Sequence, residues 1–191
     1  MTRIVAGHFR GHHLDVPDKG TRPTSSKVRE ALFSRLESWG EVADAVVLDL
    51  YAGSGALGLE ALSRGAKHVT LVDQASGAIR CCKANARRLD DSRVRVIRAS
   101  ASSFCRRPNV REPFSLVFID PPYAQDPQKV ADDLEALAVN LASEALIVWE
   151  VSHQRQIPQL PADFELEDQR KWGQTRVWFV GFRPKSGSVE T

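Results

Sequence analysis

The sequence predicts one α/β domain whose central sheet is mostly parallel and is covered by helices on both faces. Five short apolar runs alternate with stretches of helical periodicity, which is the pattern of strands joined by helical crossovers. The chain has 191 residues, 42% of them hydrophobic, and this length supports a core without disulfides or metals. Two strand-like runs end the pattern without a helix between them, so the sheet should finish in an antiparallel hairpin.

The N-terminal part of the chain is expected to form a small β-hairpin followed by a helix. Residues 3–5 and 13–16 are strand-like and have two glycines between them. Residues 25–39 carry apolar side chains at helical spacing after two hydroxyl residues that can cap the first turn. The chain therefore divides into a hairpin extension (1–23), a main domain (24–183) and a flexible tail (184–191).

Strands and helices alternate through the rest of the main domain. The expected strands are 46–50, 68–73, 93–97, 114–120 and 145–150. The expected helices lie near 57–64, 76–90, 99–107 and 127–141. Residues 164–172 and 174–182 form the final hairpin around Gly173, so one of these strands must run antiparallel to the others.

Charge is segregated along the chain, although the net charge is only +2. Residues 1–29 contain six Lys and Arg against two Asp, and residues 80–111 contain ten against two. Residues 112–168 contain twelve acidic residues and two basic ones. A basic surface beside an active site favours a polyanionic partner through counterion release, but residues 80–95 are equally consistent with a solvated helix face.

The cysteines and the absence of apolar segments indicate the compartment. Three cysteines without a CxxC motif are typical of reduced thiols in packed positions rather than disulfides or zinc ligands, and no metal site is expected. The N-terminus has no apolar signal segment, and no run approaches the ~20 apolar residues of a membrane span. We therefore expect a cytoplasmic protein. The four tryptophans follow core periodicity and should pack inside: Trp39, Trp149, Trp172 and Trp178.

A glycine-rich turn follows the first strand of the main domain. Between Asp49 and Gly58 it contains G-x-G-x-x-G, and Asp73 ends the next strand. This arrangement favours a nucleotide or nucleoside at a helix N-terminus, with Asp73 accepting hydrogen bonds from ribose hydroxyls. The carboxylate of Asp49 at the strand tip suits a cationic ligand better than a pyrophosphate. A turn alone would explain one glycine, but not three glycines with two carboxylates at the same edge.

A second motif, residues 120–123 (Asp-Pro-Pro-Tyr), ends the fourth strand of the series. Parallel strands end at one edge of a sheet, so this motif should lie beside the glycine-rich turn. Asp120 and the carbonyl of Pro121 can each accept one hydrogen of an exocyclic amine, while the ring of Tyr123 stacks on a planar base. These groups would orient the amine and stabilise the positive charge that develops during its attack on an electrophile.

Together, residues 49–58, Asp73 and residues 120–123 resemble the class I S-adenosylmethionine-dependent methyltransferases that act on amino groups, over about residues 45–182. Three further stretches resemble more narrowly the bacterial RsmD family, which methylates a guanine N2 in small-subunit ribosomal RNA: 3–7, 22–33 and 173–175. The resemblance implies an enzyme with a Rossmann-like fold and a seven-stranded sheet. It also implies S-adenosyl-L-methionine as cofactor and ribosomal RNA as partner. The compact size, with only a short extension for recognition, favours RNA within an assembled small subunit or its precursor, and we expect a monomer.

The resemblance further implies individual roles. The cofactor-binding residues would be Asp49, Tyr51, Gly53, Ser54, Gly55, Gly58, Asp73, Gln74, Ser100, Ala101 and Ser102. The catalytic residues would be Asp120, Pro121, Pro122 and Tyr123, and the RNA contacts Arg10, Arg22, Thr24, Lys27 and Arg29. Many relatives carry Asp or Asn where this chain has Ala101, so the contact to adenine would come from a backbone N–H or a serine hydroxyl.

Three other interpretations remain open at this stage. The same amino-group chemistry could serve adenine N6 or a protein glutamine, although release-factor-type enzymes usually have Asn in place of Asp120. The fold could also act as a non-catalytic RNA-binding assembly factor. G-x-G-x-x-G alone would fit a nicotinamide-dependent dehydrogenase. A comparison of the thermal shifts that S-adenosylmethionine and NAD cause would distinguish this class from a methyltransferase.

Overall fold

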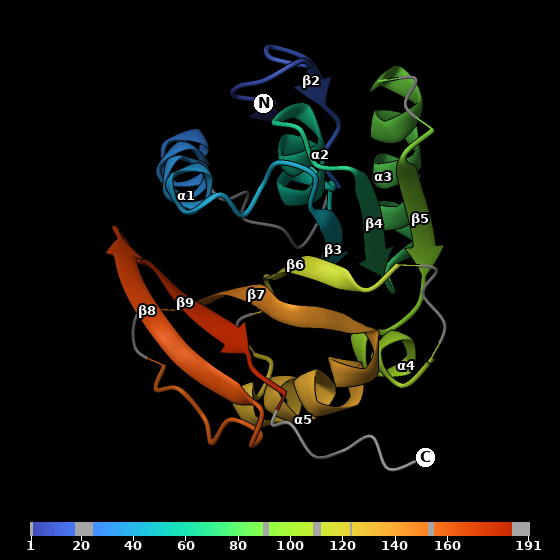
Figure 1. The fold of residues 1–191 in the computed structure, drawn as a ribbon. Coiled ribbons are helices and arrows are strands. Elements are labelled where there is room, and N and C mark those ends of the chain that lie inside the picture. Colours follow the sequence, from blue (N-terminus) through green and yellow to red (C-terminus); the bar gives the residue numbers. More distant parts are fainter. Residues whose placement is uncertain are drawn as a thin grey trace.

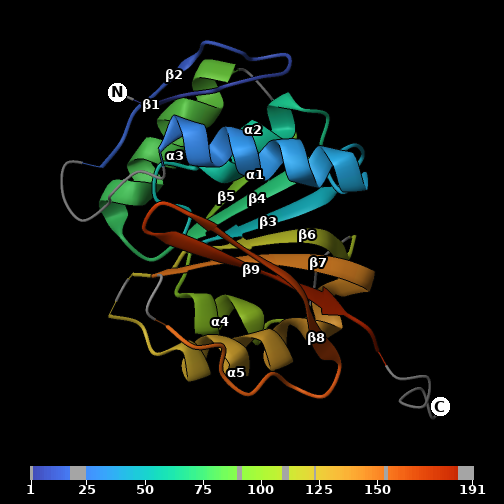
Figure 2. The ribbon, with the colours of Figure 1, turned by 90° about the vertical axis from the view of Figure 1, so that its left-hand side faces the viewer.

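The computed structural model describes residues 2–17, 25–89, 92–108, 112–122, 124–152 and 155–184. It has three layers, with a central sheet between two groups of helices (Figures 1 and 2). The helices are α1 (Ser26–Trp39), α2 (Ala56–Ser63), α3 (Ser76–Leu89), α4 (Ala101–Cys105), α5 (Pro127–Leu137) and the 3₁₀ helix η1 (Ala138–Asn140). Helices α1, α2 and α3 cover one face of the sheet, and α4 and α5 cover the other.

Nine strands form two sheets in the described residues. A two-stranded antiparallel sheet pairs β1 (Thr2–Arg3) with β2 (His13–Leu14), which confirms the expected N-terminal hairpin. The large sheet contains β3 (Val46–Leu50), β4 (His68–Asp73), β5 (Val94–Arg98), β6 (Phe114–Ile119), β7 (Leu141–Ser152), β8 (Phe164–Trp172) and β9 (Thr175–Phe182).

The order of the large sheet is β5-β4-β3-β6-β7-β9-β8. Strands β5, β4, β3, β6 and β7 are parallel, and β9 inserts antiparallel between β7 and β8. The predicted Rossmann-like fold with a C-terminal antiparallel hairpin is therefore confirmed. The chain order reverses between β3 and β6, and open α/β sheets bind ligands at the carboxyl ends of the strands at such a switch point.

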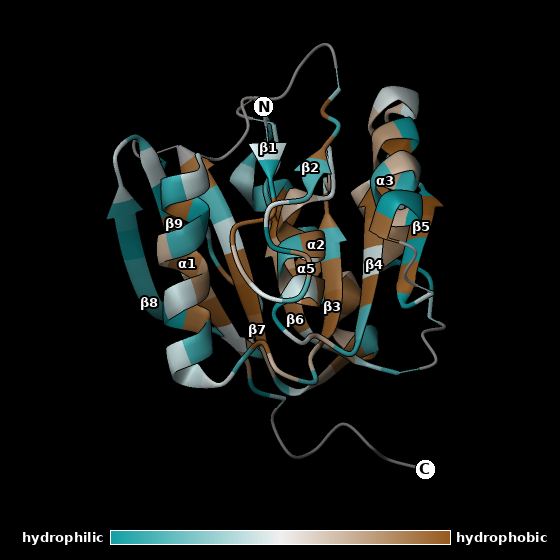
Figure 3. Ribbon diagram, turned by 90° about the horizontal axis from the view of Figure 1, so that it is seen from above, coloured by the Kyte–Doolittle hydropathy of each residue, from teal (hydrophilic) through white to brown (hydrophobic). Residues whose placement is uncertain are grey.

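Side chains of the central strands alternate between two cores, one on each face of the sheet. On β3, Val47 packs with α1 and α2, whereas Leu48 belongs to the core beneath α4 and α5. Figure 3 shows these strands as largely hydrophobic and the outer faces of α1 and β8 as hydrophilic. Burial on both faces explains why the strands read as near-continuous apolar runs. No helix within the described residues is long and apolar enough to cross a membrane.

The N-terminal hairpin is docked on α2 by buried polar side chains. The carboxylate of Glu60, which is fully buried, accepts hydrogen bonds from the backbone N–H groups of Val5 and Ala6 at 2.8 and 3.0 Å. Ser63 accepts from the N–H of Phe9 at 2.9 Å. Phe9 also joins the core of α1 and α2, so the hairpin packs as part of the main body. The predicted boundary at residues 23–24 lies outside the described residues and stays a prediction.

Helix α5 is shorter and β7 longer than the sequence predicts. The helix ends at Leu137 rather than 141, and β7 begins at Leu141 rather than 145. After Leu137 the chain tightens into the 3₁₀ helix η1, where buried Asn140 donates to the carbonyl of Arg107 at 2.9 Å. Leu141 then pairs with Phe114 across a register shift in the ladder. Tertiary contacts override helical periodicity here.

The expectation for the four tryptophans is correct for Trp149 and Trp178, which are buried and in edge contact with ring centroids 5.1 Å apart. It is wrong for Trp39, which is 39% exposed. This ring meets Phe179 edge-on, and the guanidinium of Arg35 lies 4.2 Å above its centroid. The outer face of the indole is thus covered by a cation rather than by core residues.

Candidate functional site at the carboxyl edge of the sheet

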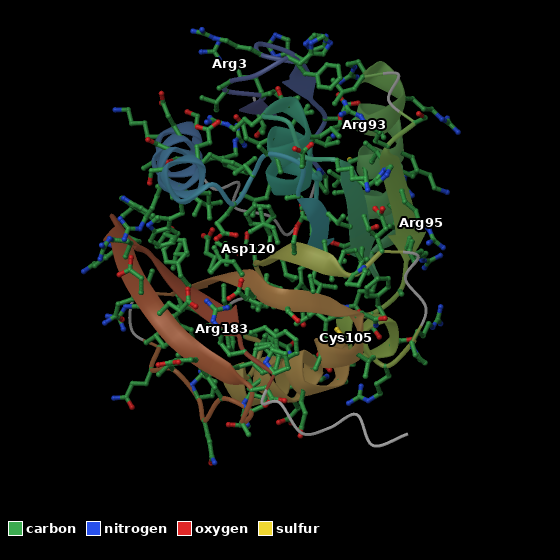
Figure 4. All side chains as sticks on the ribbon, viewed as in Figure 1. Arg3, Arg93, Arg95, Cys105, Asp120 and Arg183 are labelled. Atoms are coloured by element: carbon green, nitrogen blue, oxygen red, sulfur yellow. The ribbon has the colours of Figure 1, made fainter. Side chains whose placement is uncertain are left out.

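Three predicted acidic residues meet at the carboxyl ends of β3, β4 and β6. Asp49 lies on β3, Asp73 ends β4 and Asp120 directly follows β6. Asp73 and Asp120 both interact electrostatically with Asp49, which places the three carboxylates in one neighbourhood. In Figure 4, Asp120 lies near the centre of the molecule, between the layer of α1 and α2 and the sheet. The edge therefore carries concentrated negative charge that favours a cationic ligand.

The glycine-rich turn has a backbone that few residues other than glycine adopt. Gly53 and Gly55 have φ angles of 57° and 78°, and Tyr51 between β3 and the turn is also left-handed at 61°. Gly58 permits close packing, because a Cβ atom there would lie 2.5 Å from Leu71 Cδ2. The turn ends at the N-terminus of α2, which lies at the sheet edge. The backbone N–H groups of this helix end are near the carboxylates.

A hydrogen bond from the start of α2 holds the carboxylate of Asp49. Its Oδ2 accepts from the N–H of Gly58 at 2.9 Å, and the side chain is only 2% exposed. Burial raises the pKa of Asp49 to about 7, against the lowering effect of the Gly58 hydrogen bond and with a further increase from Asp73. No cation is among the described groups that shift this pKa, so a cationic ligand would supply a charge that balances the carboxylate.

Asp73 is tied to the glycine-rich turn through the backbone. Its Oδ2 accepts from the N–H of Gly53 at 2.9 Å, and its Oδ1 accepts from the N–H of Ala75 at 2.8 Å. These bonds fix the carboxylate at the edge and leave its remaining lone pairs available. Gln74, the next residue, is exposed, and its carbonyl accepts from Arg98 Nε at 3.3 Å.

The segment 100–102 starts helix α4. Ser100 is its N-cap, with Oγ accepting from the N–H of Ser103 at 3.2 Å. Ala101 is buried, and the hydroxyl of Ser102 donates to the carboxylate of buried Asp133 at 2.8 Å. The two hydroxyls are thus used within the fold, so the backbone of this segment is the better candidate for a ligand contact.

Two predicted positions of the glycine-rich turn serve other contacts. The carbonyl of Ser54 accepts from Nδ2 of Asn85, a buried residue of α3. Tyr51 lies beside Ala101 and Asp133 in a narrow depression next to α4 and α5. Burial raises the pKa of Tyr51 above its ordinary value, and Asp133 and Cys105 raise it further by electrostatic repulsion. The phenol stays neutral and is a hydrogen-bond donor at physiological pH.

Asp120, Pro121 and Pro122 line a cleft of about 340 Å³, which includes its open mouth. Trp149, Glu150 and Arg155 also line this cleft. Burial raises the pKa of Asp120 well above its ordinary value, and the charges of Glu150 and Asp49 raise it further. A carboxylate in this environment accepts hydrogen bonds and protons readily. Tyr123, the last residue of the motif, lies outside the described residues.

The residues predicted to contact RNA divide into three groups. Arg10 and Lys27 are exposed, as RNA contacts require, while Arg22 and Thr24 lie outside the described residues. The prediction for Arg29 is wrong, because its side chain is 2% exposed and its Nε lies 3.4 Å from Glu60 Oε2. Its guanidinium also donates to the carbonyl of Arg3. Arg29 therefore joins α1, α2 and the hairpin, and it has no surface to offer to RNA.

Sequence reasoning missed several residues of this edge. Asn85 donates to the carbonyls of both Asp15 and Ser54 at 2.9 Å, and so connects the N-terminal segment to the glycine-rich turn. A polar residue among the apolar positions of α3 was a usable signal for it. Glu150 and Trp149 reach the cleft from β7, and only the pairing of β6 with β7 reveals their position.

The chain is similar to a protein family, to curated methyltransferases and to solved structures. The family model described as conserved hypothetical protein 95 matches residues 2–181. The chain is 38% identical over 175 residues to ribosomal RNA small subunit methyltransferase D of Escherichia coli (strain K12), covering 90% of this chain and 85% of that protein. It is 33% identical over 178 residues to the putative rRNA methyltransferase YlbH of Bacillus subtilis (strain 168), covering 92% and 96% of the two chains. Among solved structures, the putative methyltransferase yhhF from Escherichia coli matches with a TM-score of 0.83 and 35% identity, over 95% of this chain and 97% of that one.

Proposed function

Since the chain belongs to the family described as conserved hypothetical protein 95, the family of RsmD-type ribosomal RNA methyltransferases, we propose that it methylates the N2 amine of a guanine in small-subunit ribosomal RNA. S-adenosyl-L-methionine is the proposed methyl donor. The position of Asp120 and Pro121 at the switch point, beside Asp49 and the glycine-rich turn, carries the proposal.

The donor set at the edge fits S-adenosylmethionine. Asp49 is buried with a raised pKa and has no cation beside it among the groups that shift this pKa, so a positively charged methionine portion would relieve an electrostatic cost. Asp73 keeps lone pairs for ribose hydroxyls after pinning the turn. The turn formed by Gly53, Ser54 and Gly55 would border the methionine portion, and Gly58 lets α2 pack closely on β4 beside it. On the adenine side would lie Gln74 and the backbone of Ser100, Ala101 and Ser102.

The residues after β6 would prepare the amine. The carboxylate of Asp120 and the carbonyl of Pro121 accept its two hydrogens, and Pro122 restricts the backbone that holds this carbonyl. This arrangement would leave the amine lone pair free to attack, and Tyr123 would stack on the base. S-adenosylmethionine would supply the methyl group: the N–CH3 bond would form as the S–CH3 bond breaks, and S-adenosylhomocysteine would leave.

Asp120 also stabilises the charge that appears on the amine nitrogen as the new bond forms. Because burial, Glu150 and Asp49 raise its pKa well above the ordinary value, Asp120 is able to accept the surplus proton or pass it to solvent. Catalysis in this proposal rests on positioning and electrostatics, without a covalent enzyme intermediate.

Recognition of the RNA is proposed to involve the exposed Arg10 and Lys27, with Arg22 and Thr24 in the same part of the chain. We place the reaction in the cytoplasm, with a monomeric enzyme acting on an assembled small subunit or its precursor. The short N-terminal hairpin offers little surface for folding free RNA, so a prefolded, protein-bound surface is the preferred substrate.

The test is methyl transfer from labelled S-adenosylmethionine to small ribosomal subunits from a strain that lacks the protein. Deproteinised ribosomal RNA, DNA and a release factor serve as parallel acceptors. Nucleoside analysis should find the label in N2-methylguanosine, with faster transfer to subunits than to free RNA.

Other outcomes discriminate between the alternatives. Label only in N6-methyladenosine or in glutamine would retain the amine chemistry of Asp120 but discard the guanine substrate. Equal rates on subunits and free RNA would refute the preference for an assembled particle. Absence of label with intact cofactor binding would favour a non-catalytic assembly factor.

A further inference from the structure

The cleft beside Asp120 contains a second carboxylate that the proposed chemistry does not use. Ile119 on β6 pairs with Trp149 on β7 in parallel register, so the next residues, Asp120 and Glu150, come level at the end of the two strands. Both line the same cleft, and the charge of Glu150 acts directly on Asp120. Two acceptor groups thus stand next to each other where the amine is expected to bind.

Glu150 is held in place by the neighbouring strand. Thr175 Oγ1 on β9 lies 3.4 Å from Glu150 Oε1, and β9 pairs antiparallel with β7 at this point. A carboxylate oriented by the sheet loses little conformational freedom when it binds a ligand. The side chain is half-buried, so its carboxylate reaches the cleft but is partly removed from water.

Trp149, the residue before Glu150 on β7, belongs to the core beneath α4 and α5, where its ring meets Trp178 edge-on. Successive side chains of a strand point to opposite faces of the sheet. Glu150 therefore points to the other face, which α1, α2 and α3 cover.

The edge chemistry of the purines decides which base matches this set. Guanine presents the N2 amine and, directly beside it, the N1–H donor, followed by the O6 acceptor. Adenine and 2-aminopurine both present an unprotonated N1, which a carboxylate repels. A second carboxylate next to the amine site therefore suits guanine and penalises purines that lack the N1–H, because an unpaired buried acceptor is costly.

Resting on the proposed function, we propose that Glu150 determines guanine specificity by accepting a hydrogen bond from N1–H while Asp120 and Pro121 hold the N2 amine. The charge of Glu150 would also contribute to stabilising the cationic nitrogen. Arg155 lines the cleft as well, so the carboxylate pair does not face an entirely acidic environment.

The test compares two bases at the methylated position, once that position has been mapped. Reconstituted subunits carry guanine or 2-aminopurine there; 2-aminopurine keeps the N2 amine but has no N1–H. Wild type should prefer guanine by about 100-fold or more in kcat/KM. Glu150→Gln, whose amide can donate to an unprotonated N1, should lose activity on guanine and reduce this preference by about tenfold or more.

Controls separate specificity from folding and from the proposed function. Glu135→Gln removes an exposed carboxylate on α5 and should leave the preference unchanged. Cofactor affinity and thermal unfolding report whether Glu150→Gln is folded. If it is not, Glu150→Asp retains the charge but withdraws the carboxylate, and should weaken guanine methylation without creating activity on 2-aminopurine.

If Glu150→Gln lowers kcat/KM on both bases by the same factor, the ratio of the two values is unchanged. That result would refute a role of Glu150 in specificity and leave the guanine-N2 activity of the wild type standing. Failure of the wild type to label guanine would overturn the proposed function and this inference together. If the wild type methylated 2-aminopurine as fast as guanine, this inference alone would be overturned.

Discussion

Replacement of Asp49 by Asn should stabilise the free protein and greatly weaken its response to S-adenosylmethionine. Burial raises the pKa of Asp49 to about 7 from an ordinary value of 3.8. Between these values the folded state retains a proton that the unfolded state releases, so the stability of the wild type falls as the pH rises. Asn cannot ionise, and its Oδ1 still accepts from the N–H of Gly58, so the variant avoids this cost.

The magnitude follows from the separation of the two pKa values. The full penalty above pH 7 amounts to about 4 kcal/mol, and about 2.5 kcal/mol of it accumulates between pH 5 and pH 8. The contribution of Asp120 does not cancel, because the charge of Asp49 also raises the pKa of Asp120; removal of that charge lowers the cost of ionising Asp120 and so acts in the same direction. The difference in unfolding free energy between Asp49→Asn and wild type should therefore grow by at least that amount across this range.

Urea unfolding followed at several pH values measures this difference, with and without S-adenosylmethionine. Cofactor at 100 times its Kd stabilises wild type by about 2.7 kcal/mol, whereas the variant should gain far less. Two stability curves that stay parallel from pH 5 to pH 8 would refute the raised pKa. A variant that the cofactor stabilises as strongly as wild type would refute the role of Asp49 in binding the cationic portion.

Three further predictions follow from the same contacts. Asp120→Ala should abolish methyl transfer while the cofactor Kd, measured by calorimetry, changes by less than about tenfold, or roughly 1.4 kcal/mol; a comparable loss of both would make Asp120 mainly a cofactor ligand. Gly58→Ala should cost about 1–2 kcal/mol in denaturant unfolding, because its Cβ would lie 2.5 Å from Leu71 Cδ2; an unchanged unfolding midpoint would contradict the close packing of α2 on β4. Glu60→Gln should destabilise the fold by about 3 kcal/mol, since the fully buried carboxylate pairs with Arg29 and Arg64 and accepts a hydrogen bond from the hairpin. Hydrogen exchange should show reduced protection of residues 2–17. Protection there equal to wild type would count against docking of the hairpin by Glu60.

The residues that define the edge could be predicted because their positions follow from strand ends alone. Asp49, Asp73 and Asp120 each follow or end an apolar run, and parallel strands bring such ends together. The glycine-rich turn was equally accessible, since its left-handed residues leave a direct mark in the sequence. Sequence reasoning therefore reached the part of the site whose geometry is local.

The errors arise where a distant residue decides the outcome. Arg29 was expected at the RNA surface because it is charged, but Glu60 on another helix provides a buried partner for it. Helix α5 was expected to continue to residue 141, but after Leu137 the chain tightens into η1, where Asn140 contacts Arg107. Neither partner is identifiable from the sequence near the residue concerned.

The layered α/β fold, the turn at its switch point and the carboxylates of the edge follow from the amino-acid sequence, because periodicity and strand ends are local properties of the chain. Which of these groups lie in one cleft, and which charges are withdrawn from water, depends on the packed fold. Glu150 reaches Asp120 through the register of β6 with β7, and Arg29 is buried through its contact with α2. The physical reason is that burial and electrostatic coupling depend on the distances between groups, and the fold sets those distances.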